Sequence, residues 1–275
     1  MVTITQQLRE YLYRPDANTF EASLMLARYS DPSLDMDRYL HLLHAWSVEL
    51  GNTISCKDEV QSKIAKLNQF LFKEKGFHVD HDDFYNPANS MMHLVIERRT
   101  GIPVTMSVLY TTLGEKVGIN LQGISFPGHF LVKAPVEEGI FVLDPYHRGA
   151  SLSEDQLAQL LKHADPKATE DSMLKYLESA SIEETVMRMM RSLKTVYFRQ
   201  KNHEQTLDIL NIMLEMNPEL VDERRERGLM LRELQCQNSA LADLEHYIRH
   251  RPNCNEATKL RVIIKKLRAD QAMLH

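Results

Sequence analysis

Apolar side chains recur every three or four residues through the first 75 residues, the spacing that places them on one face of an α-helix. Asn18 and Asp35 stand where they would cap the first turns of two such helices, and Gly76 follows a third. The apolar positions of the second and third helices are Tyr39, Leu40, Leu43, Trp46 and Leu50, then Val60, Ile64, Leu67, Phe70 and Leu71. Such stripes are typical of core packing, so we expect a helical N-terminal layer.

The pattern changes after residue 76, where a polar loop precedes a short apolar segment over residues 91–96. We expect this segment to be a helix that Gly101 stops. Pro103 suits the first turn of the next helix, because the N–H that proline lacks would have no partner there. That helix is predicted to continue over residues 104–117 and to end at Gly118.

Three short segments rich in β-branched and aromatic residues come next, over residues 121–126, 129–134 and 139–144. The last two predict a hairpin across residues 135–139. If the centre of its turn lies between residues 136 and 137, His129 stands directly opposite Asp144 on the same face of the sheet. A slip of one residue would move one of these side chains to the other face.

Helical patterns return after the strands, and from about residue 187 they repeat. Ser153 and Ser181 each begin a capping box, and Pro218 and Pro252 are 34 residues apart, the period of tetratricopeptide repeats. In that register the equivalent positions are Tyr197 and Leu231, Thr206 and Ala240, Leu210 and Leu244, and Met213 and Tyr247. Residues 256–272 predict a capping helix. A plain bundle of helical hairpins is the alternative.

These elements together predict an α+β fold. Residues 1–175 form a mostly helical N-terminal domain with a small antiparallel sheet, packed on the helix that starts at Pro103. Residues 181–275 form an all-α region of tetratricopeptide-like repeats with its capping helix.

Composition limits the classes of function. Of the 275 residues, 43% are hydrophobic and 26% are charged, as in soluble globular proteins. The net charge of −5 argues against a nucleic-acid partner, and no apolar run is long enough for a membrane span. Three scattered cysteines and an N-terminus without a signal-peptide core predict a cytoplasmic, reduced protein.

Four short strings carry a family resemblance: Asn86-Pro87-Ala88-Asn89-Ser90, Glu97-Arg98-Arg99-Thr100-Gly101-Ile102-Pro103, Pro127-Gly128-His129-Phe130 and Asp144-Pro145. Their order and spacing resemble the SirB-type branch of the transglutaminase-like superfamily. The resemblance implies a papain-like core followed by tetratricopeptide-like helices. It also implies a catalytic triad of a cysteine at a helix N-terminus, a histidine and an aspartate.

His129 and Asp144 match the second and third members of this triad. The cysteine nucleophile has no counterpart in this sequence. The family's nucleophile falls near Pro103, and the helix that begins there contains no cysteine. Thr105 or Ser107 would replace it only within hydrogen-bond reach of His129, and a helix-packing role is the simpler interpretation of both. Cys56 could enter the site from the N-terminal helices, but we expect it to be a buried, inert thiol.

A pocket beside His129 and Asp144 is predicted to include Asn86, Asn89, Ser90, Glu97, Pro103 and Arg148. Arg148 would pair with an anion or with Glu97, or else be a solvated surface residue. Carboxylates and imidazoles that suit a divalent ion crowd one loop, at His78, Asp80, His81, Asp82 and Asp83, and His147 follows Asp144. A hydrated acidic loop is the simpler interpretation, so we predict neither a metal nor another cofactor.

Two functions from different classes remain. The first is a cytoplasmic interaction or regulatory protein, a pseudoenzyme whose repeat helices bind a protein or peptide partner and neither nucleic acid nor membrane. The alternative is an acyl-transfer enzyme or amide hydrolase with a substitute nucleophile, His129 as its base and Asp144 orienting that base. The oligomeric state stays open.

Overall fold

The computed structural model describes residues 3–273, except for the side chains of residues 170–172 and 270–273. Backbone contacts divide the chain into two compact units, Met1–Met189 and Met190–His275. The predicted domain limits, residues 1–175 and 181–275, stay a prediction, because the long helix α9 (Ile182–Arg199) runs through the dividing point. Among the described residues, no helix combines the length and the apolar character that crossing a membrane requires.

The first unit begins with a helical layer of α1 (Ile4–Leu12), α2 (Thr19–Ala27), α3 (Met36–Gly51) and α4 (Val60–Asn68), of which the apolar stripes predicted the last three. The side chains of Asn18 and Asp35 accept hydrogen bonds from backbone N–H groups in the first turns of α2 and α3, so both caps are confirmed. A π-helical turn, Gln69–Glu74, extends α4 toward Gly76, whose φ is 74°. The stripe residues Leu43, Leu50 and Leu67 are buried.

The next two helices are α5 (Met92–Arg98), after a 3₁₀ turn over Pro87–Ser90, and α6 (Pro103–Lys116). Pro103 is the first residue of α6, as predicted. The prediction that Gly101 ends α5 is wrong, because Arg99 ends it in the left-handed conformation, with φ of 58°. The Arg99 guanidinium lies 4.6 Å from the ring centre of Trp46 and 5.2 Å from that of Phe77, and these contacts favour the unusual backbone.

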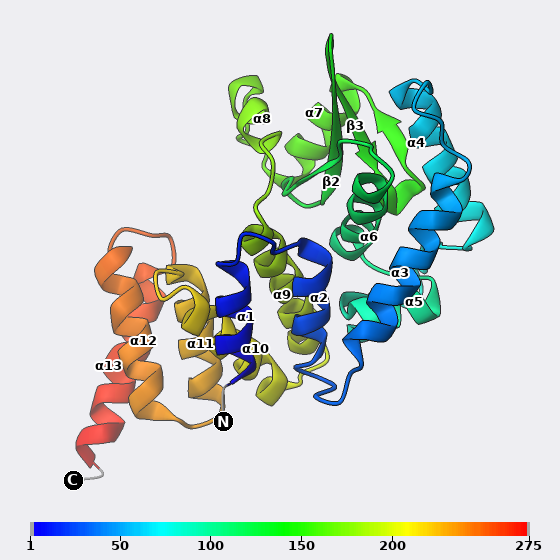
Figure 1. Cartoon of the computed structure of the whole chain (residues 1–275). Coiled ribbons are helices and arrows are strands. Elements are labelled where there is room, and N and C mark those ends of the chain that lie inside the picture. The colour runs from blue at the N-terminus through cyan, green and yellow to red at the C-terminus, as the bar shows by residue number, and fades with distance from the viewer. Residues whose placement is uncertain (1–2, 274–275) are drawn as a thin grey trace. The chain divides into compact units, whose positions relative to one another are not determined.

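Four antiparallel strands form the sheet in chain order: β1 (Gln122–Ile124), β2 (Leu131–Val136), β3 (Gly139–Asp144) and β4 (Ala150–Leu152). Figure 1 shows α6 and α7 (Glu154–Ala164) on either side of β2. From α7, Leu157 and Leu161 join a buried cluster with Ile124, Phe126, Leu131 and Val142 of the sheet region. A short helix, α8 (Glu170–Tyr176), follows. The sequence patterns missed α1, α8 and β4.

The predicted hairpin register is wrong by one residue at its centre. Val136 pairs with Gly139, which leaves Glu137 and Glu138 as the turn. Pro135 belongs to β2 and not to the turn. A proline is tolerated at this position of the strand because β1 pairs with β2 only as far as Lys133, so no neighbouring strand needs the N–H that proline lacks. His129 therefore precedes β2, and Asp144 pairs with Ala150 of β4 instead of facing His129.

The second unit contains the end of α9, then α10 (His203–Met216), α11 (Val221–Glu233), α12 (Gln237–His250) and α13 (Ala257–Met273), which is the predicted capping helix. Its 34-residue period is present in the backbone itself. Lys201 and Gln235 occupy equivalent loops and share a left-handed φ, 57° and 60°. Gly228 is needed where α11 meets α12, because a Cβ there would lie 2.9 Å from Cγ of Leu244.

Candidate functional site

Asp144 is the centre of the candidate site, at the end of β3, and its side chain is only 4% exposed. Its Oδ2 accepts hydrogen bonds from Nε2 of His129 and Nδ1 of His147, both at 2.7 Å. Its Oδ1 accepts from the backbone N–H groups of Tyr146, at 3.0 Å, and His147, at 3.2 Å. Burial by itself would raise the pKa of the Asp144 carboxyl, but the two imidazoles outweigh it and lower that pKa below its usual range.

His129 lies in the turn before β2, where its backbone N–H donates to the carbonyl of Phe126 and Gly128 takes a φ of 71°. The ring is 11% exposed and packs edge-on against Tyr146, at 6.1 Å between ring centres. Because Nε2 donates to Asp144, Nδ1 is the ring nitrogen left for a substrate or nucleophile. The predicted association of His129 with Asp144 therefore exists through side chains, although the strand register does not create it.

His147 is the member of this group that the sequence patterns underestimated. They noted it only as a neighbour of Asp144, whereas its ring reaches back across a 3₁₀ turn, Pro145–His147, that the Asp144 carboxylate caps. The His147 side chain is 60% exposed, so this side of the group faces solvent. The available signal was the string Asp-Pro-Tyr-His, because an aspartate that caps a turn is close to a side chain three residues later.

The two candidate substitute nucleophiles have their hydroxyls engaged elsewhere. Thr105 Oγ1 lies 3.0 Å from the Asn89 carbonyl and 3.1 Å from that of Ile102, and it accepts from the Ile102 N–H. Ser107 Oγ donates to the carbonyl of Phe130 at 3.2 Å. Among the side chains that the structure describes, no hydroxyl or thiol is hydrogen-bonded to His129.

Cys56 is exposed, so the expectation of a buried thiol is wrong. It lies in the turn between α3 and α4, where the neighbouring Lys57 and Asp58 keep the chain at the surface. The Cys56 thiol is therefore accessible to reagents in solution.

The residues of the Asn-Pro-Ala-Asn-Ser string hold the loop before α5 in place. The Asn89 side chain is buried, donates to the carbonyl of Asp83 at 2.7 Å and accepts from Arg98 at 3.0 Å. Arg98 also forms an ion pair with Asp83, at 2.5 Å, and Asn86 donates to the same carboxylate. Ser90 is buried, and its hydroxyl has no partner among the described residues.

The other predicted pocket residues make separate contacts. Glu97 accepts from the Tyr39 hydroxyl at 2.6 Å and lies 3.5 Å from Arg38. Arg148 is exposed, in a left-handed conformation with φ of 60°, and forms none of the ion pairs found within the described ranges. Pro103 is half-buried at the first position of α6. The pocket around His129 and its membership stay predictions.

One group of side chains in the described part of the chain has the composition and spacing of a metal site: His129, Asp144 and His147. One ligand atom from each lies within 4.8 Å of the others. The acidic loop that the sequence singled out does not form such a group. There, Asp80 accepts from the backbone of residues 82 and 83, and Asp83 is held by Arg98.

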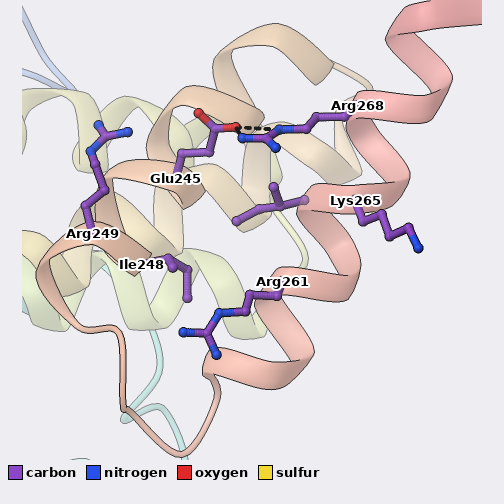
Figure 2. Close-up of a pocket in the computed structure, with 7 residues that line it drawn as sticks. Glu245, Ile248, Arg249, Arg261, Lys265 and Arg268 are labelled. Carbon is purple, nitrogen blue, oxygen red and sulfur yellow. Dashed lines mark hydrogen bonds and ion pairs between the residues drawn. The ribbon is translucent and has the colours of Figure 1, made fainter.

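Two hollows lie in the described part of the repeat unit. A groove of about 520 Å³ lies between α12 and α13 and is lined by Glu245, Ile248, Arg249, Arg261, Ile264, Lys265 and Arg268. Figure 2 shows Arg261 extending from α13 toward Ile248, and Arg268 paired with Glu245 across the groove. A second, more apolar hollow of about 550 Å³ lies over α9, α10 and α11 and includes Phe198, which is 59% exposed.

Comparisons with known proteins agree with this architecture. The transglutaminase-like superfamily matches residues 37–191, and a tetratricopeptide repeat family matches residues 193–265. A UPF0162 protein of Xylella fastidiosa (strain Temecula1) is 30% identical over 255 residues, 92% of this chain and 91% of the relative. UPF0162 proteins of Vibrio cholerae (31% identical, covering 77% of this chain and 79% of the relative) and Pseudomonas aeruginosa (26%, covering 82% of each) are also similar. No solved structure matches. The predicted resemblance and fold class are confirmed.

Proposed function

The chain belongs to the transglutaminase-like superfamily and to the UPF0162 proteins, and we propose that it acts as a protein-interaction protein and not as an enzyme. In this proposal the transglutaminase-like core is a scaffold without its cysteine nucleophile. The repeat region binds an acidic segment of a partner protein, and the role is regulatory. Tetratricopeptide repeats generally mediate protein–protein interaction, which supports the second part.

The hydrogen bonding of Thr105 and Ser107 is the observation that carries the proposal. A substitute nucleophile must give its proton to His129, and both of these hydroxyls instead bond backbone groups inside the core. Both side chains are fully buried, so neither is open to a substrate. His129 and Asp144 then serve as a hydrogen-bonded pair that ties the turn before β2 to the end of β3.

Charge supports an acidic segment as the partner of the groove between α12 and α13. The groove is lined by four cationic side chains and one carboxylate, and that carboxylate, Glu245, is already paired with Arg268. Ile248 and Ile264 supply apolar surface between the charges. An amphipathic peptide with carboxylates beside an apolar face complements both features.

Three free cysteines, two of them exposed, support the proposed cytoplasmic location, because thiols stay reduced in that compartment.

The catalytic part of the proposal is tested with the purified full chain. Chromogenic esters and a glutamine peptide with an amine acceptor cover hydrolysis and acyl transfer. We expect rates indistinguishable from those of the His129→Ala variant. Turnover by the unsubstituted chain that His129→Ala abolishes would overturn the scaffold role.

The binding part is tested with a fluorescent amphipathic peptide rich in glutamate and a matched peptide in which glutamine replaces every glutamate. We expect the acidic peptide to bind more tightly, and the double variant Arg249→Glu/Arg261→Glu to lose about tenfold or more in affinity. Lys259→Glu is the matched control, because Lys259 is an exposed cation of α13 outside the groove. Equal losses in the two variants, or tighter binding of an oligonucleotide than of the peptide, would contradict the proposal.

The intact bond between His129 and Asp144 favours a second candidate, the acyl-transfer enzyme or amide hydrolase. Asp144 orients His129 and leaves its Nδ1 to take a proton, which is the arrangement that a nucleophile requires. Fluorophosphonate and iodoacetamide probes, followed by peptide mass spectrometry, test this candidate. Labelling of Thr105 or Ser107 that depends on His129 would support it. Labelling confined to the exposed cysteines counts against it.

A further inference from the structure

We propose that His129, Asp144 and His147 together form a binding site for a divalent transition-metal ion, with Zn²⁺ as the representative ligand. The site would use Nε2 of His129, Oδ2 of Asp144 and Nδ1 of His147, which lie within 4.8 Å of one another. This inference goes beyond the proposed function and does not depend on whether the repeat region binds a partner.

The donor set is the first argument. Two imidazole nitrogens and one carboxylate oxygen are ligands that zinc accepts, and three protein ligands leave its fourth position to water or another small ligand. The three residues come from two separate segments, the turn before β2 and the turn after β3. Packing of the sheet has therefore already brought the ligands together before any ion arrives.

The second argument is how firmly the carboxylate is held. Oδ1 of Asp144 accepts two backbone N–H groups, so Oδ2 is the oxygen presented to the imidazoles. His129 is confined in turn by the edge-on contact with Tyr146. Ligands that are oriented by their own hydrogen bonds and packing bind an ion with less rearrangement than free side chains do.

Geometry requires one modest adjustment. Both imidazoles now donate to Oδ2 at 2.7 Å, whereas ligand atoms around a tetrahedral ion with bonds of about 2.1 Å lie roughly 3.4 Å apart. Each imidazole would move about 0.7 Å away from Oδ2, and its proton would lie on the ring nitrogen that does not bind the ion. The side chain of His147, 60% exposed, has the freedom to do so, and it also marks the route by which an ion enters.

Calorimetric titration of the full chain with ZnCl₂, after removal of metals by a chelator, tests the site. We expect about one equivalent to bind at this site and the His147→Ala variant to weaken that binding by about tenfold or more. His147→Ala is the main variant because its exposed side chain is removed without opening the core. Asp144→Asn is the second variant, with circular dichroism to check that it folds.

Other side chains that bind zinc determine the controls of this titration. Cys56 and Cys236 are exposed and would bind zinc by themselves, so the titration is repeated with both changed to serine. His44→Ala removes an exposed histidine of α3 and should leave affinity unchanged. The visible spectrum of the Co²⁺-substituted protein gives a second readout, because tetrahedral coordination produces an intense band that His147→Ala should abolish.

Zinc binding that persists in His147→Ala, or that disappears with the two cysteines, would overturn the inference. So would the absence of any binding to the folded, metal-free chain. The peptide-binding test of the repeat region has a separate readout and separate variants, so the two proposals fail independently.

Discussion

Thr105 connects two parts of the core through a single hydroxyl. Its Oγ1 accepts from the backbone N–H of Ile102 and contacts the carbonyl of Asn89, so the start of α6 is tied to the turn before α5. Asn89 and Arg98 extend this network to Asp83. At the scale of residues, the motif strings that suggested a catalytic family therefore supply buried hydrogen bonds that shape the loop before α5.

Thr105→Val tests this structural role. The substitution keeps the side chain's shape and leaves the Ile102 N–H without a partner in a buried place, which should lower the free energy of unfolding by about 1–3 kcal/mol. Urea denaturation measures it. The control is Thr111→Val, whose hydroxyl bonds only carbonyls of its own helix. A loss no larger than in the control would contradict the prediction.

His93 should make stability depend on pH. Its ring is buried, its Nδ1 has no partner among the described residues, and burial lowers its pKa below the usual range. The unfolded chain then binds a proton at a higher pH than the folded chain does. The contribution of neutral His93 to stability is therefore fully present above the ordinary histidine pKa, near 6.5. As the pH drops below that value, the free energy of unfolding falls.

The variants for this prediction are His93→Leu and, as a control, His44→Leu at an exposed position of α3. Urea denaturation at about pH 7.5 and about pH 5.5 gives the loss of stability between the two conditions. We expect that loss to be smaller in His93→Leu than in the unsubstituted chain, and unchanged in His44→Leu. An equal loss in all three proteins would show that His93 does not titrate as argued.

Elements of the repeat unit end in the same way at equivalent positions. Lys201 follows α9 and Gln235 follows α11, both with a left-handed φ, and the next residue donates its N–H to Tyr197 in one case and Leu231 in the other. The 34-residue period seen in the sequence thus corresponds to a repeated helix ending. Neither position is glycine, the residue that adopts this conformation without strain.

Gln235→Gly should therefore stabilise the repeat unit by about 0.5–1 kcal/mol, since glycine removes the strain of the left-handed backbone. Thermal unfolding measures the gain. Lys259→Gly, at an exposed position inside α13, should instead cost about 0.5–1 kcal/mol. If Gln235→Gly were as destabilising as Lys259→Gly, the strain argument would be wrong.

Gly228→Ala tests the contact between α11 and α12. The added Cβ would lie 2.9 Å from Cγ of Leu244 and 3.1 Å from Cβ of Asp243, so the helices must move apart. We expect a loss of about 1–3 kcal/mol, despite the higher helix propensity of alanine. A double-mutant cycle with Leu244→Ala checks the cause, because removing the crowded side chain should make the two effects non-additive.

The whole molecule carries a net charge of −5, yet the groove between α12 and α13 is lined mainly by cations. The cations of the groove would therefore attract an acidic partner only at short range. The net negative charge of the whole chain would not assist the approach of that partner. Specific binding in the groove would then be distinct from a general affinity for anions, which a net charge of −5 disfavours.

Binding of the acidic peptide should accordingly weaken as salt rises from about 50 to about 500 mM, because surface charge pairs are screened over about 10 Å or less. Fluorescence anisotropy across this range measures the dependence. The Arg249→Glu/Arg261→Glu variant should have a flat or reversed response. A salt dependence that is the same in both proteins would place the contact outside the groove.

Local sequence signals determined most of the helices of this protein, and long-range contacts decided the site. Caps such as Asn18 and Asp35, the first turn at Pro103 and the 34-residue period depend on hydrogen bonds and packing between residues close in the chain, so they were readable in advance. The presence of His129 and Asp144 was also readable, through the family strings. The register between their strands was not, and the predicted pairing of His129 with Asp144 across the hairpin is absent, because a strand register depends on which residues pair along the whole edge.

Only the tertiary structure brought His129 to the carboxylate oxygen that His147 reaches across its own turn, and only it directed the hydroxyls of Thr105 and Ser107 into the core. The direction in which a side chain points depends on the backbone groups that surround it in space. Those groups come from the 3₁₀ turn before α5, the start of α6 and the residue before β2, and no pattern along the chain specifies how they meet.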